Sequence, residues 1–164
     1  MKNLFLISIL LLSFSCFSQS CIPILSEDKN YINNLDGTTT DPSTGLMWQR
    51  CPIGTNWENG SCAGNPIPMD WQTALFESRK SRLLGYSDWR LPNLKELLSI
   101  VDFNCDSPAI NEQYFNVFQT NKYWTSTPII NYGGSVYSVS FGQGGGFYNT
   151  GNDYTHYIRL VRYK

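Results

Sequence analysis

The chain has 164 residues, with 12 Lys+Arg, 13 Asp+Glu and a formal net charge of −1. This length has room for one domain. The near balance of charges gives no overall field that attracts nucleic acid or anionic membranes. We therefore expect a single domain without a nucleic-acid partner.

The first twenty residues have the pattern of an export signal. A positive start is followed by an apolar run over residues 4–12 and then by small residues. We predict residues 1–20 as a signal peptide, cleaved after Ser18 or Ser20, with a lipid anchor on Cys16 as the alternative. The apolar run is too short to span a bilayer, so we expect no transmembrane segment in a protein that is secreted, periplasmic or on the cell surface.

Four cysteines remain after such cleavage, and in an exported domain they predict two disulfides. Of the three pairings we favour Cys51 with Cys62, because the loop between them contains turn-forming Pro, Gly and Asn-Gly. The other bond, Cys21 with Cys105, would join the N-terminal arm to the middle of the domain. Metal ligation is the alternative, but the sequence has no Cys-x-x-Cys and its single histidine is distant. We expect no metal and no cofactor.

The first half of the chain predicts an arm, a hairpin and a helix. Residues 21–36 have little periodicity and form the arm. Residues 37–50 predict a β-hairpin, because Asp-Pro-x-x-Gly in the middle has the chemistry of a turn. A helix is predicted from Asp70, which can cap the first turn, to about Leu84, and Gly85 would end it as a left-handed cap.

A short segment around residue 90 links a tight turn to a second helix. Trp89 belongs to a Trp-Arg-Leu-Pro run, and Asn93 with Glu96 has the N-x-x-E pattern of a capping box. We predict a helix over residues 94–101. In the turn before it, we expect Asp88 and Arg90 to form an ion pair in preference to a catalytic role, because Trp-Arg-Leu must be held in place.

After Cys105 the sequence becomes rich in Asn, Ser, Thr, Gly, Tyr and Phe. Short alternations predict strands over residues 123–127, 136–141 and 157–162. The three glycines at 144–146 read as a flexible turn and lack the Lys-Ser/Thr of a phosphate loop. The order of strands, then helices, then strands predicts an α+β fold.

Seven segments in the same order resemble one known family: 36–41, 44–51, 71–74, 85–97, 108–111, 123–127 and 159–162. That family is the Lcl C-terminal domain, named for the end domain of a collagen-like adhesin. The resemblance covers residues 30–163, and we assign residues 37–164 to an Lcl C-terminal-like domain. This chain lacks the Gly-X-Y repeat that would let it trimerise through a collagen triple helix.

The resemblance implies a C-type-lectin-like single domain, with two helices packed on short antiparallel sheets and a relation to formylglycine-generating enzymes. It also implies affinity for sulfated or other polyanionic glycans. Formylglycine chemistry needs cysteines late in the domain, and none follows Cys105. The tripeptides of calcium-dependent lectins are absent, and Gly151-Asn152-Asp153 reads as a turn because calcium needs six to eight ligands.

Catalysis by a nucleophile and a base has little support in the sequence. His156 lies among tyrosines, and no Gly-x-Ser-x-Gly or similar elbow accompanies it. A lone histidine in this setting is more often packed or on the surface than a general base. We therefore expect no catalytic residues and no enzyme activity.

Glycan binding needs flat apolar faces, amides for hydroxyl groups, and Arg or Lys for sulfate or carboxylate. The loops of the C-terminal half supply the first two. The candidate ligand-binding residues are Tyr132, Phe147, Tyr148, Asn149, Asn152 and Tyr154, with the basic cluster Arg79, Lys80 and Arg82. For the basic cluster a solvated helix face is the default interpretation and a sulfate-binding patch the alternative. We expect Trp48, Trp71, Trp89, Trp124, Tyr137 and Phe141 to belong to the core.

These observations predict an exported, non-enzymatic binding module that recognises a glycan or another extracellular polymer in the manner of an adhesin. The alternative is an interaction or structural component of the cell envelope, with a protein partner and no affinity for sugars.

Overall fold

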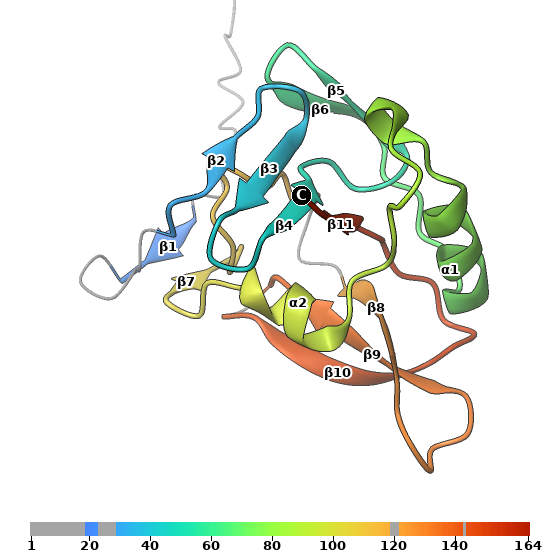
Figure 1. Cartoon of the computed structure of the whole chain (residues 1–164). Helices are drawn as coiled ribbons and strands as arrows, with labels where there is room; N and C mark the ends of the chain where they lie inside the picture. Colours follow the sequence, from blue (N-terminus) through green and yellow to red (C-terminus); the bar gives the residue numbers. More distant parts are fainter. Residues whose placement is uncertain (1–18, 23–28, 119–121, 143) are drawn as a thin grey trace, which may run out of the picture.

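The computed structural model describes residues 19–22, 29–118, 122–142 and 144–164. The predicted signal peptide lies outside these residues, except for Gln19 and Ser20. The elements, shown in Figure 1, are β1 (Ser20–Cys21), β2 (Ile32–Asn33), β3 (Thr38–Asp41), β4 (Leu46–Gln49), β5 (Thr55–Glu58), β6 (Ser61–Gly64), α1 (Trp71–Lys80), the 3₁₀ turn η1 (Leu83–Gly85), α2 (Leu94–Ser99), β7 (Cys105–Asp106), β8 (Lys122–Pro128), β9 (Ser135–Ser140), β10 (Gly146–Gly151) and β11 (Val161–Tyr163). Helices and short antiparallel sheets together confirm the predicted α+β class.

The first sheet has the strand order β11-β4-β3-β2, and all its pairs are antiparallel. Its centre is the predicted hairpin of β3 and β4, which is confirmed. The Asp41 carboxylate accepts hydrogen bonds from the backbone N–H of Ser43 at 2.9 Å and from its hydroxyl at 2.5 Å. Gly45 then takes a positive φ of 68°, a conformation that favours glycine. The turn residues thus bring β4 back beside β3.

The second sheet has the order β10-β9-β8. The strands predicted over 123–127 and 136–141 correspond to β8 and β9, and the loop between them projects from the body of the molecule (Figure 1). Gly146 begins β10, so the three-glycine turn ends where a strand that we did not predict starts. That strand has few apolar or β-branched residues, and it forms because its whole length pairs with β9.

The last predicted strand, 157–162, is only partly correct. Three residues form β11, and the residues before it run between the two sheets. Tyr157 accepts a hydrogen bond from Trp124 N–H at 2.9 Å, whereas Leu160 accepts one from Gln49 N–H at 3.0 Å. Because successive carbonyls bond to different elements, no regular ladder extends over this segment.

The first helix is shorter than predicted. Asp70 caps it as expected and accepts from Thr73 N–H at 2.9 Å, but the helix ends at Lys80 and Ser81 is its C-cap. The separate turn η1 follows, in which Leu84 has a positive φ of 54°. The prediction of Gly85 as the helix cap was therefore wrong. Trp89 donates to the Leu83 carbonyl at 2.9 Å, a bond that draws the chain away from the helix axis.

The second helix ends at Ser99, two residues before the predicted end, and its capping box is confirmed. The predicted ion pair between Asp88 and Arg90 is wrong. Arg90 instead donates two hydrogen bonds of 2.7 Å to Glu96, and Asp88 accepts one of 2.8 Å from Arg162. The reason is that the capping box turns Glu96 back toward Arg90, while β11 runs antiparallel beside the Trp-Arg-Leu turn.

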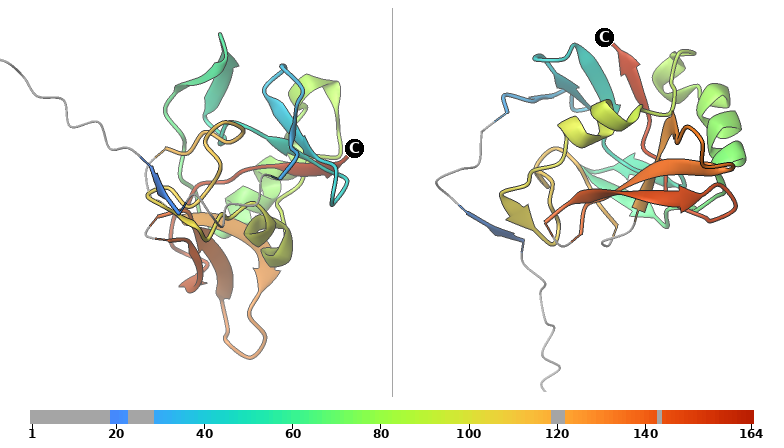
Figure 2. Two further views of the ribbon diagram at one scale, coloured as in Figure 1. Left: turned by 90° about the vertical axis from the view of Figure 1, so that its left-hand side faces the viewer. Right: turned by 90° about the horizontal axis from the view of Figure 1, so that it is seen from below.

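Two hydrophobic clusters form the core, one mainly under α2 and one between α1 and the sheets. Figure 2 shows α2 across the β8-β9-β10 sheet and α1 beside it. The predicted core residues Trp48, Trp89, Trp124 and Phe141 are buried, as expected. Trp71, the first residue of α1, and Tyr137, which lies between the buried Val136 and Ser138 of β9, are only half-buried.

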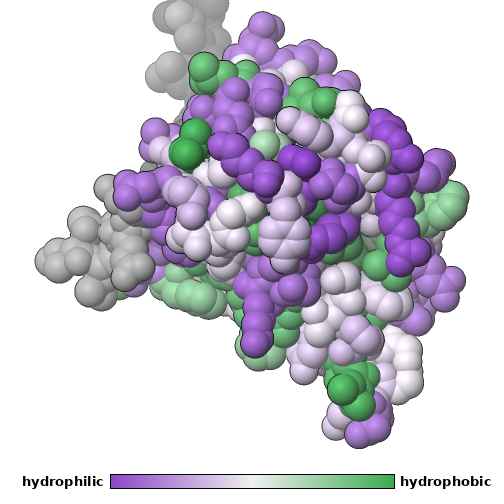
Figure 3. Space-filling view, in the orientation of Figure 1, coloured by the Kyte–Doolittle hydropathy of each residue, from purple (hydrophilic) through white to green (hydrophobic). Residues whose placement is uncertain are grey.

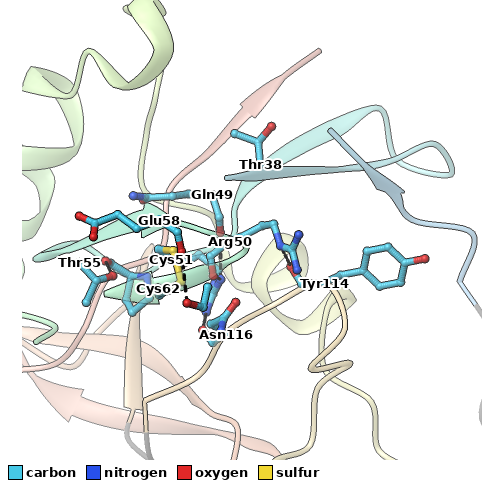
Figure 4. The surroundings of a disulfide bond; sticks show 12 residues. Thr38, Gln49, Arg50, Cys51, Thr55, Glu58, Cys62, Tyr114 and Asn116 are labelled. Atoms are coloured by element: carbon cyan, nitrogen blue, oxygen red, sulfur yellow. Dashed lines mark hydrogen bonds between the residues drawn. A yellow bond between two sulfur atoms is a disulfide. The ribbon is translucent and has the colours of Figure 1, made fainter. Parts of the chain in front are cut away.

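Two arginines fix the loop over residues 113–116 by its backbone. Arg50 donates to the carbonyls of Gln113 at 2.6 Å and Tyr114 at 3.0 Å. Arg159, which is fully buried, donates to the carbonyls of Gln49, Arg50 and Asn116. Figure 4 shows Arg50 reaching this loop beside a disulfide. The loop is thereby joined to the end of β4.

Both predicted disulfides are present. Cys51 pairs with Cys62 and Cys21 with Cys105. The cysteine-bounded loop contains β5 and the turn at Asn59 and Gly60, and Cys62 lies in β6; we did not predict this hairpin. Disulfides of this kind indicate an oxidising environment, outside the cell or in the periplasm. None of the helices in the described ranges has the length and apolar character needed to cross a membrane.

Candidate functional site

A surface cavity of about 460 Å³ lies between the start of α1 and the projecting β8–β9 loop. We call it the aromatic hollow. Its wall includes Trp71 from the helix, and Asn131 and Tyr132 from the loop, with Asn152 from the segment after β10. Two of these, Tyr132 and Asn152, are among the predicted binding residues.

Backbone hydrogen bonds hold the aromatic hollow together. Within the loop, Ser135 N–H donates to the Tyr132 carbonyl at 2.9 Å. Asn152 joins the loop to the helix, because its N–H donates to the Gly134 carbonyl at 2.7 Å and its own carbonyl accepts from Trp71 N–H at 3.3 Å. Gly134 has a positive φ of 75°, and a Cβ there would lie 3.4 Å from the Asn152 amide oxygen. The loop and Asn152 thus form one connected unit.

The side chains of the hollow offer two kinds of contact. Trp71 donates its indole N–H to the Thr125 carbonyl at 2.8 Å, so its ring is held in place. Tyr132 is 63% exposed, which leaves its ring free for a ligand. The side-chain amides of Asn131 and Asn152 can donate and accept hydrogen bonds. The arrangement suits a ligand that has both apolar faces and hydroxyl groups.

The other predicted aromatic residues lie elsewhere. Phe147, Tyr148 and Asn149 are exposed on β10, the edge strand of its sheet. The Phe147 ring packs against Tyr137 with 5.8 Å between centroids, and the Lys122 ammonium lies 4.2 Å from the Tyr148 ring. These residues do not line the aromatic hollow.

Tyr154 is 62% exposed and also lies outside the aromatic hollow. It is close to Gly151, where a Cβ would approach the tyrosine ring to 3.3 Å. The predicted binding set therefore separates into two residues in the hollow and four outside it.

The three predicted basic residues also separate. Lys80 lies 3.5 Å from Glu77 and 4.9 Å from the Phe76 ring centroid. Arg82 donates to the carbonyls of Arg79 at 3.1 Å and Ser81 at 2.9 Å, at the end of α1. Arg79 lines a second cavity, which Lys80 and Arg82 do not line.

That second cavity, of about 480 Å³, lies between α1 and α2, and we call it the basic hollow. Arg79 and Arg90 contribute the positive charges of its wall, and Glu96 contributes a negative charge. Glu96 is paired with Arg90 through two hydrogen bonds of 2.7 Å. Within the described ranges the Arg79 guanidinium has neither an ion pair nor a hydrogen-bond partner. One guanidinium is therefore available in the basic hollow.

The lone histidine lines neither hollow. The His156 ring packs on Trp124 with 4.3 Å between centroids, and its buried Nε2 has no hydrogen-bond partner among the described residues. Burial lowers its pKa below the ordinary value of 6.5; a backbone hydrogen bond at Thr155 opposes this, and the charge of Lys122 adds a smaller effect in the same direction as burial. As for metals, the described part of the chain contains no group of three His, Cys, Asp or Glu able to hold an ion.

Sequence reasoning missed Trp71 and Asn131. Trp71 was assigned to the core by its helical spacing. As the first residue of α1 it packs at the edge of the core and stays half-exposed. A usable signal was present in Asn131-Tyr132-Gly133-Gly134, which separates two predicted strands and has the composition of an exposed turn.

Comparison with curated proteins and with solved structures finds no match. The family model of the Lcl C-terminal domain matches residues 37–162. The match runs from the start of the β3–β4 hairpin into β11, and it includes the whole lining of the aromatic hollow and that of the basic hollow except Tyr163. The chain therefore belongs to the Lcl C-terminal domain family.

Proposed function

We propose that this protein is an exported, non-enzymatic binding module of C-type-lectin-like fold, and that it holds an extracellular glycan in the aromatic hollow. The observation that carries the proposal is the exposed ring of Tyr132 beside Trp71 and two asparagine amides in one cavity.

The chemistry of this cavity matches that of a sugar. A pyranose ring has an apolar face of C–H groups, which packs on aromatic rings, and hydroxyl groups, which bond to amides. The cavity volume of about 460 Å³ lies in the range of small-molecule sites. Its components come from three separate parts of the chain that are already hydrogen-bonded to one another, so binding requires little ordering of the protein.

The absence of acid-base groups from this cavity supports binding without catalysis. Among the described residues that line it, none is Asp, Glu, His, Cys or Lys. Most glycosidases use a pair of carboxyl groups at the scissile bond. A sugar held here would meet aromatic, aliphatic, hydroxyl and amide groups and no carboxyl group, and it would be released unchanged.

The proposal is tested by a glycan array with the oxidised protein, probed with calcium and with a chelator. We expect hits that do not require calcium. Tyr132→Ala should weaken binding of these glycans at least tenfold, because it removes the exposed ring. Tyr154→Ala is the matched control, since that tyrosine is exposed to the same degree but lies outside the hollow. Equal affinities of both variants and the wild type would reject the proposal, provided that the melting temperatures agree.

A second candidate is a protein-binding component of the cell envelope, favoured by the apolar tip of the projecting loop. Ile130 is 81% exposed there, and Figure 3 shows a green apolar patch on this projection. Exposed apolar side chains on projections serve as anchors in protein interfaces. Under this alternative, pull-down from envelope extracts should capture a protein with the wild type and lose it with Ile130→Ser, and oligosaccharide should not compete.

A further inference from the structure

We infer that a cavity separate from the aromatic hollow and the basic hollow binds a small organic ammonium ion with an apolar body. The carboxylate of Asp102 receives the ammonium group, and the phenol oxygen of Tyr31 accepts a hydrogen bond from it. This inference goes beyond the proposed function, because the cavity shares no lining residue with the aromatic hollow.

This cavity, of about 320 Å³, lies between the end of α2 and the arm that precedes β2, and we call it the Asp102 cavity. Its volume is at the lower end of the range of small-molecule sites. Apolar and polar side chains share its wall, which includes Leu98, Ile100, Val101, Tyr31, Asp102 and Asn111. It therefore suits a small ligand that has an apolar body and a polar head group.

The backbone around Asp102 is held in place from several sides. Asp102 N–H donates to the Ala109 carbonyl at 3.0 Å, and the Asp102 carbonyl accepts from Cys105 N–H at 3.1 Å. Cys105 also forms the disulfide with Cys21, which joins this turn covalently to the arm. The site is thus formed before a ligand arrives, which lowers the entropy cost of binding.

The Asp102 carboxylate has no ion-pair partner among the described residues. Its Oδ1 accepts from Asn104 N–H at 3.0 Å, and its Oδ2 lies 3.4 Å from the Cys105 sulfur. That sulfur belongs to a disulfide and carries no hydrogen to donate. Lys29, which also lines the cavity, donates to the Ser99 carbonyl and forms no ion pair with Asp102. A ligand ammonium would supply the missing positive charge.

The hydroxyl of Tyr31 also lacks a partner. The residue is only 7% exposed, and its hydroxyl has no hydrogen-bond partner in the described part of the chain. Its ring is fixed against Tyr114 and Phe115, with 5.3 and 5.2 Å between centroids. Burial raises the pKa of the phenol, and the negative charges of Asp41 and Asp102 add to this, so the group stays protonated. An unpaired buried hydroxyl costs free energy, and an ammonium bound to Asp102 would give it a donor.

These contacts select the head group of the ligand. A protonated amine has three N–H donors, which suit the carboxylate of Asp102 and the phenol oxygen of Tyr31. A calcium ion needs six to eight oxygen ligands, and this wall contributes one carboxylate. The apolar side chains from the end of α2 give the body of the amine a surface to pack on, which a hydrated metal ion would not use.

The test compares ligands that share a body and differ in the head group. Phenethylamine has an ammonium, phenethyl alcohol a neutral hydroxyl, and hydrocinnamate a carboxylate. In calorimetric titrations of the oxidised protein, we expect the amine to bind at least tenfold more tightly than the alcohol, and the acid not to bind. Nα-acetyl-lysine methylamide distinguishes the sources of the ammonium. Affinity equal to that of the amine would indicate a lysine side chain of another protein, and weaker affinity would indicate a free amine.

Variants locate the site. Asp102→Asn keeps the acceptor for Asn104 N–H and removes the charge, so it should weaken binding of phenethylamine at least tenfold and change that of the alcohol by less than twofold. Asp106→Asn is the matched control, because it removes the same charge from an exposed position outside the cavity, and it should change neither by more than twofold. Tyr31→Phe keeps the packed ring, loses the acceptor and should weaken binding of the amine at least threefold.

Several results would overturn the inference. Equal affinity of the wild type for the amine and the alcohol would do so whatever the variants show. Equal losses in Asp102→Asn and Asp106→Asn would show attraction by net charge alone. A loss in Tyr132→Ala as large as that in Asp102→Asn would place the amine in the aromatic hollow. A wild type that binds no amine overturns this inference and leaves the proposed function standing, because the glycan array reports on a different cavity.

Discussion

Burial of His156 changes the pH at which this side chain becomes charged. Its ring packs on Trp124, and burial lowers its pKa below 6.5 because the imidazolium loses water contacts. The nearby charge of Lys122 acts in the same direction. The chain has 1 His, so no other side chain has an ordinary pKa in this range. Stability between pH 7.5 and 5.5 therefore reports on this one group.

We expect the protein to lose stability as pH falls through 6.5 toward the lower pKa of the folded state. The unfolded chain binds the proton more tightly than the folded protein does, so protonation favours unfolding. His156→Phe keeps an aromatic ring against Trp124 and cannot titrate. Between pH 7.5 and pH 5.5 the melting temperature of the wild type should fall, and that of the variant should stay level. If both melting temperatures change with pH in the same way, this account is contradicted.

Sequence could identify some site residues and not others. Tyr132 and Asn152 were predicted because aromatic and amide residues beside glycines indicate exposed loops. The separation of Arg79 from Lys80 could not be predicted. Helical spacing gives the direction of each side chain, but the partner of each charge depends on which residues of other elements lie opposite.

Among the elements, the start of α2 shows how one side chain serves two purposes. Glu96 accepts from the backbone N–H of Asn93 at 2.8 Å in the capping box and also binds Arg90. Burial opposes ionisation of Glu96, but the hydrogen bonds from Arg90 and Asn93 outweigh it, so its pKa is lowered below 4.5. The ion pair and the helix cap are thus formed together.

We expect Glu96→Gln to lower the free energy of unfolding by about 1–2 kcal/mol at pH 7, because glutamine can still cap the helix but loses the charge-assisted bonds to Arg90. The carboxylate contributes stability above pH 4.5, and this contribution is lost as pH falls through its lower folded pKa. Urea titrations should therefore differ most between the two proteins at neutral pH and converge near pH 3. Glu112→Gln, at an exposed position, is the control and should match the wild type.

The elements that sequence predicted well are those with local causes. The β3–β4 turn, the Asp70 cap and the Asn93 capping box all depend on residues within a few positions of each other. The strand β10 forms by pairing with a second strand, β9, and the chain after α1 is bonded to Trp89 in the segment that follows it. Propensity alone cannot show such contacts, because tertiary pairing overrides it.

At the level of the whole molecule, residues 19–21 are bonded to the folded domain. Gln19 donates from its side-chain amide to the carbonyls of Pro108 at 2.7 Å and Ile110 at 2.6 Å. Ser20 pairs with Asp106 in β1 and β7, and the disulfide of Cys21 follows directly. A chain cleaved after Ser20 would lose these bonds, whereas one cleaved after Ser18 would keep them.

We therefore expect the exported protein to retain Gln19. Mass spectrometry of its N-terminal peptide should find Gln19 and Ser20 before Cys21, and a mature chain that starts at Cys21 would contradict this. The physical reason can be checked separately. Gln19→Ala should lower the free energy of unfolding by about 1 kcal/mol, because two partly buried carbonyls lose the side-chain donor.

The α+β class and both disulfides could be predicted at this scale because composition, element order and cysteine spacing are visible in the sequence. The division into separate sheets could not. β11 pairs with β4 across more than half of the domain, and the segment before it bonds to both large sheets. Pairings at such sequence distances depend on the packing of the complete fold.

The loop at residues 113–116 is held by Arg50 and Arg159 through carbonyl oxygens that every amino acid possesses. The hold is therefore independent of what the side chains at Gln113 and Asn116 are. A loop attached by side-chain contacts would lose its position when those side chains change. In this loop, residues 113 and 116 can be substituted while the backbone bonds to the two arginines stay in place. The molecule thus has a stretch of surface whose shape is fixed and whose chemical character is open to change, close to the disulfide that closes the β5–β6 hairpin.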